Sequence, residues 1–441
     1  MAKPGLVGAC ALLLSVACLA QSTPPSPPAL DLSLAKAIEL ASSPHANTSV
    51  EMALESEGLF HSRYTAARSL LLPALDVSVA EQNQTVNPKA IGLRFQNPAF
   101  SIPSEVGPFY TFDARVRLTQ NLFDLSDIRH RQAAREDVEA AKTDAASVRE
   151  RVSATVARLY ATLLRVDAQV AASDANIADA KALRDLAVHQ VDAGEGTELE
   201  ATRAKLNVAR SEQKKLDAET ARTHTELELI QALNLNWDTP LHLTGSLDST
   251  PTETLSVAEY VEMALNARAD FREEDERIKS AKLSESAATL ERMPSLEGYA
   301  NYGVLEGEQT HVVGAALRVP LFDGGRIASD EMQAKTLVRQ EQIRQKELRS
   351  QVELEIRQAL AAIATARLRI QVAEEAVGLA EEELGRARRR FEAGITNGVE
   401  VMDAQAQLAG ARDDRVAALF DSASARIDLA QATGAIATLS F

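Results

Sequence analysis

Apolar residues recur alternately four and three positions apart along two long stretches of the chain. The first stretch runs from Val152 to Ala180, and the second, from Val352 to Ala380, keeps the same rhythm. An apolar seam sustained over about four heptads is typical of coiled-coil packing. Because no proline interrupts the first stretch, we expect one helix from about Ser126 to Val191, on the order of 100 Å long.

A glycine-containing break follows each long helical stretch. Residues 192–199 read DAGEGTEL and residues 392–400 read EAGITNGVE, with Gly194 and Gly394 at matching positions. Glycine in a helix interior costs about 1 kcal/mol relative to alanine, so a helix should stop at each break. The apolar rhythm then restarts, which predicts that each break is the turn of a long antiparallel helical hairpin. In the first hairpin the returning seam is expected at Leu199, Thr202, Leu206, Ala209, Gln213, Leu216 and Thr220.

Four shorter segments alternate with a period of two and are predicted to be β-strands. Between Tyr110 and Thr119 the even-numbered residues are apolar and the odd-numbered ones polar, and residues 311–319 alternate similarly. Residues 75–79 begin a third strand, and residues 296–304 form a weaker fourth. Such alternation suits a sheet on a core or a membrane barrel with a polar lumen. In a barrel, the lumen would be lined by Asp113, Arg115, Arg117 and Arg318.

The number of strands limits how a barrel could form. About eight strands is the smallest number known for a membrane barrel, and open strand edges are not tolerated in lipid. The chain must therefore share one barrel among several copies, if it forms one.

One unit is used twice along the chain. The segment NLFDLSDIRHR from Asn121 returns as PLFDGGRIASD from Pro320, and the two glycine-containing breaks lie at equivalent places. We therefore expect a first repeat over residues 31–236, a linker over 237–254 and a second repeat over 255–441. Each repeat is predicted to contain a helix, a strand pair (at about 295–320 in the second repeat) and a helical hairpin. The predicted fold class is mainly α with a small transmembrane β part.

The first repeat carries an insertion that the second lacks. It falls within residues 84–109, which contain Pro88, Pro98, Pro103 and Pro108 and show no alternation. Proline is confined to edges and bulges in strands, so we expect a long loop here, where the second repeat has only the short turn EGEQT.

The N-terminus has the composition of an export signal. Lys3 precedes an apolar stretch from Leu6 to Leu19, and small residues end at Ala20, which predicts a signal peptide over residues 1–20 cleaved near Ala20. Lipid attachment at Cys18 is a rival interpretation. Residues 21–30 are expected to be a Pro-rich lead-in. Both cysteines lie in this leader, so cleavage leaves no disulfide or thiolate metal site.

The net charge of −16 argues against a nucleic-acid partner.

The combination of these features resembles the TolC-like outer-membrane efflux proteins of Gram-negative bacteria. It consists of the signal peptide, the duplicated unit, the strand pairs followed by LFD and the tip RFEAGITNGVEVMDAQ. The resemblance implies a homotrimer whose twelve strands form one barrel in outer-membrane lipid, continued by an α-helical barrel through the periplasm. It also implies that a periplasmic adaptor docks at the hairpin tips and links them indirectly to an inner-membrane transporter. The tip residues are Gly194, Thr197, Gly394, Thr396 and Gly398.

Acidic residues follow the second tip. Glu400 and Asp403 lie three residues apart on one helix face, whereas the first tip has Glu200 and Arg203 at the equivalent places. One interpretation is that acids simply favour the positive end of the helix dipole. The other, implied by the resemblance, is that Glu400 and Asp403 from three chains form acidic rings at the periplasmic entrance, where Glu200 and Arg203 would also lie. The basic run from Arg386 to Arg390 is interpreted as a solvated helix face.

No enzyme motif is visible in the sequence. The stretch Ser33 to Lys36 spells S-x-x-K, but its duplicate from Ser256 to Glu259 is a capping box, so Ser33 is interpreted as a helix N-cap. No cofactor or metal site is expected.

The predicted function is an exit duct of a tripartite efflux or type I secretion system. The alternative is a structural trimeric coiled-coil surface protein.

Overall fold

The computed structural model describes residues 30–44, 47–88, 90, 92, 103–247 and 255–439. Several sequence-based predictions therefore lie outside the described residues. These are the signal peptide, the lipid attachment at Cys18, most of the Pro-rich lead-in, the middle of the loop over residues 84–109 and the end of the linker over 237–254.

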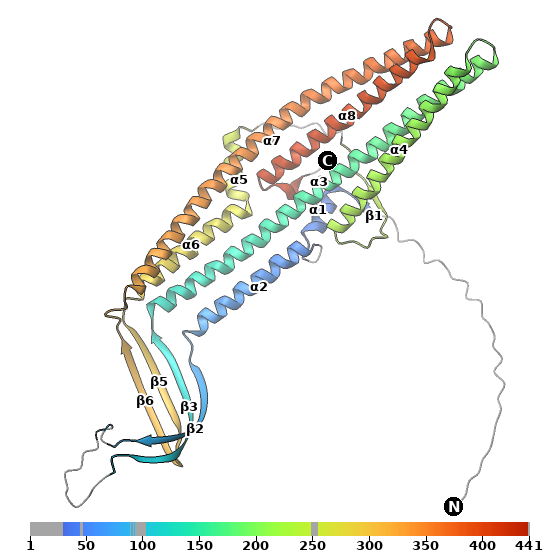
Figure 1. Ribbon diagram of the computed structural model, residues 1–441. Coiled ribbons are helices and arrows are strands. Elements are labelled where there is room, and N and C mark those ends of the chain that lie inside the picture. The colour runs from blue at the N-terminus through green and yellow to red at the C-terminus, as the bar shows by residue number, and fades with distance from the viewer. Residues whose placement is uncertain are drawn as a thin grey trace, which may run out of the picture.

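The molecule is long and slender, with a small sheet at one end and two helical hairpins at the other (Figure 1). It is mainly helical, as predicted. The first half contains α1 (Leu34–Ser42), α2 (Thr48–Ser69), β2 (Ala74–Val86), β3 (Val106–Phe123), α3 (Leu125–Asp192) and α4 (Glu198–Ala232). The second half contains α5 (Val257–Ala267), α6 (Ala269–Leu290), β5 (Ser295–Leu305), β6 (Glu308–Arg318), α7 (Arg326–Glu392) and α8 (Gly398–Ala432).

The two long helices bury the seams that their sequences predict. In α3, Val156 and Leu163 are fully buried, and in α7, Val352 and Ile356 are fully buried. Helix α3 begins one residue before the predicted start at Ser126 and ends one residue after the predicted end at Val191. Asp124 caps its start by accepting a hydrogen bond from the Asp127 N–H.

The predicted seam of the returning helix α4 was wrong. Leu206 and Leu216 are 50% and 56% exposed, while Ala201, Ala204 and Val208 are buried. Short side chains let two helix backbones approach closely, so α4 packs on α3 through its small residues. Leu206 and Leu216 are left on the outer surface, where they are free to contact another chain or molecule.

The four predicted strands form one antiparallel sheet in the order β2-β3-β5-β6. The turn between β5 and β6 is made by Glu306 and Gly307, which have φ angles of 53° and 85°. Positive φ at both central residues is the hairpin turn that matches strand twist, which explains the short connection. Two three-residue strands that were not predicted, β1 (Leu30–Leu32) and β4 (Leu241–Leu243), pair in parallel near the middle of the molecule.

The β2–β3 hairpin is longer than predicted. Its ladder continues to Gln84 opposite Phe109 and, after a bulge, to Val86 opposite Val106. The expected loop over 84–109 is therefore shorter, and Pro108 lies within β3 at the edge of the bulge region. Because β3 pairs with β5 only from Asp113 onwards, the end of the β2–β3 hairpin projects beyond β5 and β6 (Figure 1).

A large cluster of buried apolar side chains lies near the middle of the molecule. Tyr160 of α3 is fully buried there. Its hydroxyl donates to the Leu32 carbonyl and accepts from the Gly245 N–H, both at 3.1 Å. This side chain therefore joins α3 to the segment before α1 and to the segment after β4.

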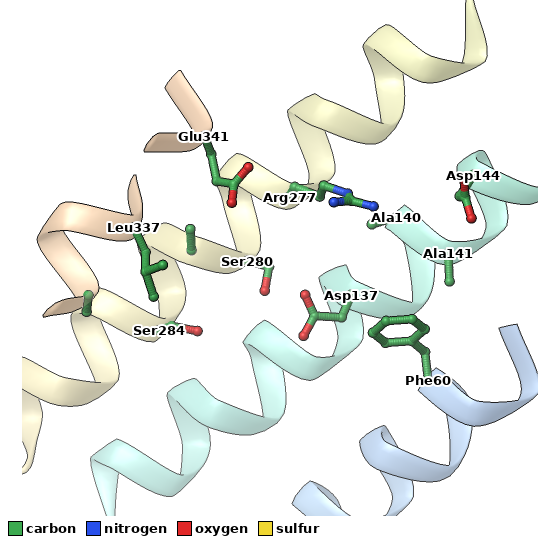
Figure 2. A pocket seen from close by; sticks show the side chains of 12 residues that line it. Phe60, Asp137, Ala140, Ala141, Asp144, Arg277, Ser280, Ser284, Leu337 and Glu341 are labelled. Atoms are coloured by element: carbon green, nitrogen blue, oxygen red, sulfur yellow. The ribbon is translucent and has the colours of Figure 1, made fainter. Parts of the chain in front are cut away.

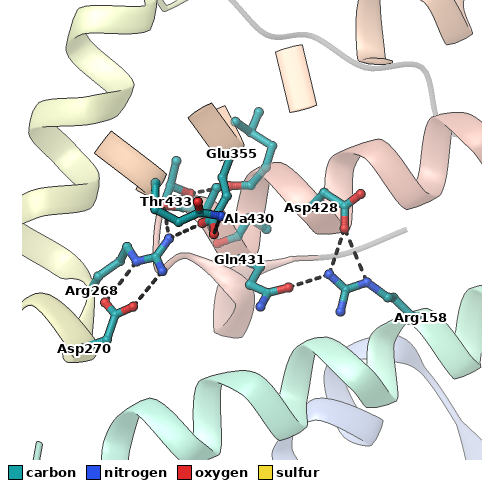
Figure 3. A network of polar contacts seen from close by, with 11 residues as sticks. Arg158, Arg268, Asp270, Glu355, Asp428, Ala430, Gln431 and Thr433 are labelled. Carbon is teal, nitrogen blue, oxygen red and sulfur yellow. Dashed lines mark hydrogen bonds and ion pairs between the residues drawn. The ribbon is translucent and has the colours of Figure 1, made fainter. Parts of the chain in front are cut away.

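Equivalent joints in the two halves hold the ends of α4 and α8. At the start of α2, the Asn47 side-chain amide donates to the Ala232 carbonyl at 3.1 Å. At the start of α6, Arg268 donates to the Ala432 carbonyl at 3.2 Å and also pairs with Asp270 and Glu355 (Figure 3). The carbonyl at the helix end is thus bound by a neutral amide in the first repeat and by a charged guanidinium in the second.

Helix starts agree with the predicted capping. The Ser33 hydroxyl accepts from the Lys36 N–H, and Ser256 and Glu259 form a capping box. None of the described helices has an apolar stretch long enough to cross a bilayer.

Candidate functional site

The two hairpin tips end their outgoing helices in the same way. At the first tip Gly194 has a φ of 78°, and the Glu195 N–H donates to the Gln190 carbonyl at 2.8 Å. The same pattern recurs at the second tip, where Gly394 has a φ of 69°. This left-handed helix termination suits glycine, which adopts it without strain. The glycine break is therefore a helix stop with a defined geometry.

At the first tip, Glu200 contacts both hairpins. Thr197 caps α4 by accepting from the Glu200 N–H at 3.3 Å, and the Glu200 carboxylate accepts from the Thr197 N–H at 3.3 Å. The other carboxylate oxygen of Glu200 accepts from the Gly398 N–H at 3.4 Å. One side chain thus links the first turn of α4 to the first turn of α8.

The remaining tip residues are placed differently from one another. Glu400 is half-buried; it accepts a hydrogen bond from the Thr396 hydroxyl and forms an ion pair with Arg390 at 3.2 Å. Asp403 is exposed, one turn further along α8. Arg203 lies beside Glu200 and Gly398, around a small hollow between the hairpins. The carboxylate of Asp403 is therefore the more accessible of the two acids after the second tip.

A polar cluster that the sequence did not predict joins the two hairpins below their tips. Asp179 of α3 pairs with Arg388 of α7 at 2.8 Å and with Arg412 of α8 at 3.0 Å. The Gln405 amide donates to the Asp179 backbone carbonyl at 2.7 Å. Asp179 and Arg412 each expose 22% of their side chains, so water screens these pairs only in part.

The interpretation of the basic run as a solvated face was wrong for Arg388. Arg386 is exposed beside Glu382, but Arg388 reaches across to α3. The signal that could have identified the cluster is a difference between the repeats, since Asp179 occupies the position at which the second repeat has the exposed Leu379. A carboxylate on an otherwise duplicated helix indicates a contact that the duplicate lacks.

A protein-family model matches most of the chain. The model of the outer membrane efflux protein family matches residues 49–235 and 260–435, which is most of the described structure. The chain belongs to the outer membrane efflux protein family. A comparison with curated protein sequences gave no match.

Solved structures share the fold of this efflux protein. The outer membrane protein VceC of Vibrio cholerae is 20% identical, with a TM-score of 0.74, 91% of this chain and 96% of that chain being covered. The CmeC outer membrane channel of Campylobacter jejuni is 18% identical, with a TM-score of 0.74 and coverage of 91% and 85%. The MtrE outer membrane channel of Neisseria gonorrhoeae, in its open state, is 18% identical, with a TM-score of 0.73 and coverage of 91% and 89%.

The sheet of the efflux protein has one polar and one apolar face. Asp113, Arg115 and Arg117 alternate along β3, and the ladder through β5 places Arg318 of β6 on the same face. Asp113 and Arg115 form an ion pair. The opposite face carries exposed apolar side chains, which include Leu75, Val77, Val79, Tyr110, Val313 and Leu317. The four predicted lumen residues therefore share one surface.

The sheet of the efflux protein has two open edges, at β2 and β6. β2 and β6 each have a partner on one side only within the described part of the chain. Such edges present rows of unpaired N–H and C=O groups that can pair with another strand.

No group of three or more histidine, cysteine or acidic side chains among the described residues could hold a metal ion. The family is one of efflux proteins rather than enzymes.

Proposed function

We propose that this efflux protein is an outer-membrane exit duct formed by three copies of the chain. The observation that carries the proposal is the four-stranded sheet, with an apolar face, a polar face and two open edges. Open edges and unpaired backbone groups are not tolerated in lipid, and four strands are too few to close a barrel. Three copies give twelve strands, with the apolar face against outer-membrane lipid and Asp113, Arg115, Arg117 and Arg318 in the lumen.

The helices support the same assembly. Exposed apolar side chains follow the outer surface of both hairpins, at Leu206 and Leu216 of α4 and at Leu368, Val372 and Leu379 of α7. A soluble helix with so many exposed leucines is expected to bury them against a partner. Packing between neighbouring copies would bury them and continue the barrel as a tube of helices through the periplasm.

The hairpin tips are the proposed docking surface for a periplasmic adaptor. They lie at the end of the molecule furthest from the sheet (Figure 1). The residues proposed to form the surface are Gly194, Thr197, Gly394, Thr396 and Gly398. Through the adaptor the duct would receive substrate from an inner-membrane transporter and export it passively.

The direct test is to extract the protein in detergent, determine its mass and record its conductance in planar bilayers. We expect a trimeric tube that forms ion-conducting pores. A trimer that never conducts would favour the alternative of a structural coiled-coil surface protein. A monomer would contradict both.

Acids near the tips are proposed to make the entrance select cations. Three copies of Glu400 and Asp403 in a narrow mouth would focus negative potential. Because Glu400 is paired with Arg390, Asp403→Asn should remove more of the cation preference than Glu400→Gln. Reversal potentials in a salt gradient measure the effect. Asp414→Asn, an exposed acid further along α8, serves as the control. Equal selectivity in the native channel and the Asp403→Asn variant would contradict the prediction.

The segment that joins β2 to β3 is proposed to lie at the extracellular rim. Its strands lead at their other ends into α2 and α3, which run towards the tips. Phe109, which falls within the range predicted as a loop, belongs to the β3 ladder. Deleting residues 88–104 spares that ladder, so the trimer should persist while single-channel conductance rises.

The side of the membrane can be tested separately. An epitope tag inserted at Pro98 should bind antibody on intact cells. Binding only after the outer membrane is permeabilised would place the segment on the periplasmic side and overturn this topology.

A further inference from the structure

An open hollow lies where four helices run side by side near the sheet. Its volume is about 300 Å³, and its walls come from α2, α3, α6 and α7. In the wall of helices, α3 packs between α2 and α6, and α6 packs on α7. Figure 2 shows Phe60 of α2 at one side of the hollow and Leu337 and Glu341 of α7 at the other.

The hollow lies on the concave side of this wall. The middle helices α3 and α6 are in contact and form its floor, while side chains of the outer helices α2 and α7 border the same space. Because side chains from both outer helices border this one space, we infer that the wall curves towards it. In the proposed duct, the concave side of the wall faces the lumen.

Carboxylates dominate the polar part of the lining. Asp137 and Asp144 of α3 are half-buried and form no ion pair or hydrogen bond with another described residue. Arg277, the cation at the hollow, is already paired with Glu273. The negative charge of the two aspartates is therefore not balanced within the described structure.

A second pair of acids adjoins the hollow. Glu341, which pairs with Arg344 at 2.7 Å, lies against Glu274 of α6, and one carboxylate oxygen of Glu274 is buried without a partner. Burial, and then the nearby Glu341, raises the pKa of Glu274 to about 7. Like-charged groups pressed together in this way are stabilised by a nearby cation.

The hydroxyl of a largely buried serine also points into the hollow. Ser280 exposes only 6% of its surface, and within the described part of the chain its hydroxyl makes no hydrogen bond to another residue. Figure 2 shows it directed from α6 towards Asp137. The oxygen itself is open to the hollow, so it can donate a hydrogen bond to, or accept one from, a ligand or water there.

The apolar lining and the spread of the acids exclude a simple metal site. Phe60, Leu337 and four alanines line the hollow, and no three acidic or histidine side chains of the described residues converge closely enough to hold a metal ion. Separated carboxylates beside apolar surface match an extended molecule that carries positive charge and an apolar body.

We propose that this hollow is a binding site for organic cations with an apolar body, such as protonated aromatic amines, on their way through the duct. The apolar body would lie between Phe60 and Leu337, and the cationic group would lie near Asp137 and Asp144, with Ser280 as a hydrogen-bonding partner. The proposal rests on the proposed duct, because only there does the concave wall face the transport path.

The test measures binding of the cationic dye rhodamine 6G to the full-length protein in detergent, by fluorescence anisotropy. The double variant Asp137→Asn with Asp144→Asn should bind the dye about tenfold more weakly, since each partly screened charge contributes a few-fold. Ala281→Phe, which fills the hollow without changing its charge, should abolish binding. Glu347→Gln, an exposed acid elsewhere on α7, should bind as the native protein does.

The anionic dye fluorescein, of similar size, should bind to none of these proteins. Unchanged rhodamine binding in either the double variant or Ala281→Phe would overturn the proposed site, as would equal binding of fluorescein. Bilayer conductance of the same preparations separates the two proposals. Conducting pores without site-dependent dye binding would refute the cation site alone, whereas a native protein that does not conduct would refute the duct.

Discussion

Replacing Arg268 with alanine should lower the free energy of unfolding by about 3–5 kcal/mol, the usual cost of removing one partner of a buried ion pair. The Arg268 side chain is only 11% exposed and pairs with Asp270 and Glu355, each at 2.7 Å. It also donates to the Ala432 carbonyl at the end of α8. Alanine would leave two carboxylates and a carbonyl without this partner, so the start of α6, the middle of α7 and the end of α8 should loosen together.

Thermal unfolding of the detergent-extracted protein, followed by helical circular dichroism, measures this loss as a fall in Tm. Arg158→Ala is the matched control. Arg158 also bonds two side chains, Asp428 and Gln431, but it is 43% exposed (Figure 3). An exposed pair is worth about 1 kcal/mol or less, so this variant should melt close to the native protein. Equal falls in Tm for the two variants would show that burial at Arg268 does not matter.

Replacing Asp179 with alanine should open the periplasmic end of the proposed duct. Asp179 is the counter-ion of both Arg388 and Arg412, and so it ties α3 to the second hairpin. Hydrogen bonds to charged groups contribute about 2 kcal/mol, so losing this tie should shift the ratio of closed to open channels about thirtyfold. Without Asp179 the two arginines also repel each other, which favours separation of the hairpins.

The expected result is a higher mean conductance in planar bilayers. Glu382→Ala removes an equally charged partner from an arginine, Arg386, but this exposed pair lies within α7 and joins no hairpins. It should leave conductance unchanged. If Asp179→Ala conducts like the native channel, the cluster fixes the fold of the hairpins without restraining their separation.

The sequence predicted those elements whose signals are local and repeated. The helix α3 was predicted to within one residue at each end, because Asp124 and Gly194 mark its limits in the sequence itself. The alternation from Tyr110 to Thr119 likewise predicted the polar face on which Arg115 and Arg117 lie. The three-residue strands β1 and β4 were missed because so short a segment shows no period.

The inward face of α4 was mistaken because leucine was given more weight than alanine. Packing against α3 depends on how closely the two backbones approach, and Ala201 and Ala204 allow a closer approach than Leu206. The Asp179 cluster was missed for a different reason. It joins α3 to α7 and α8, which lie far from α3 in the sequence, and periodicity describes each helix alone.

The joints formed by Asn47 and Arg268 have a consequence for the symmetry of the assembled duct. Three copies, each with two repeats, would place six such joints around the tube. A neutral amide holds every second joint, and a guanidinium with two carboxylates holds the others. The ring thus alternates between pliant and stiff positions. Any widening of the tube should begin at the three amide joints, and its cross-section should then change from nearly hexagonal to triangular.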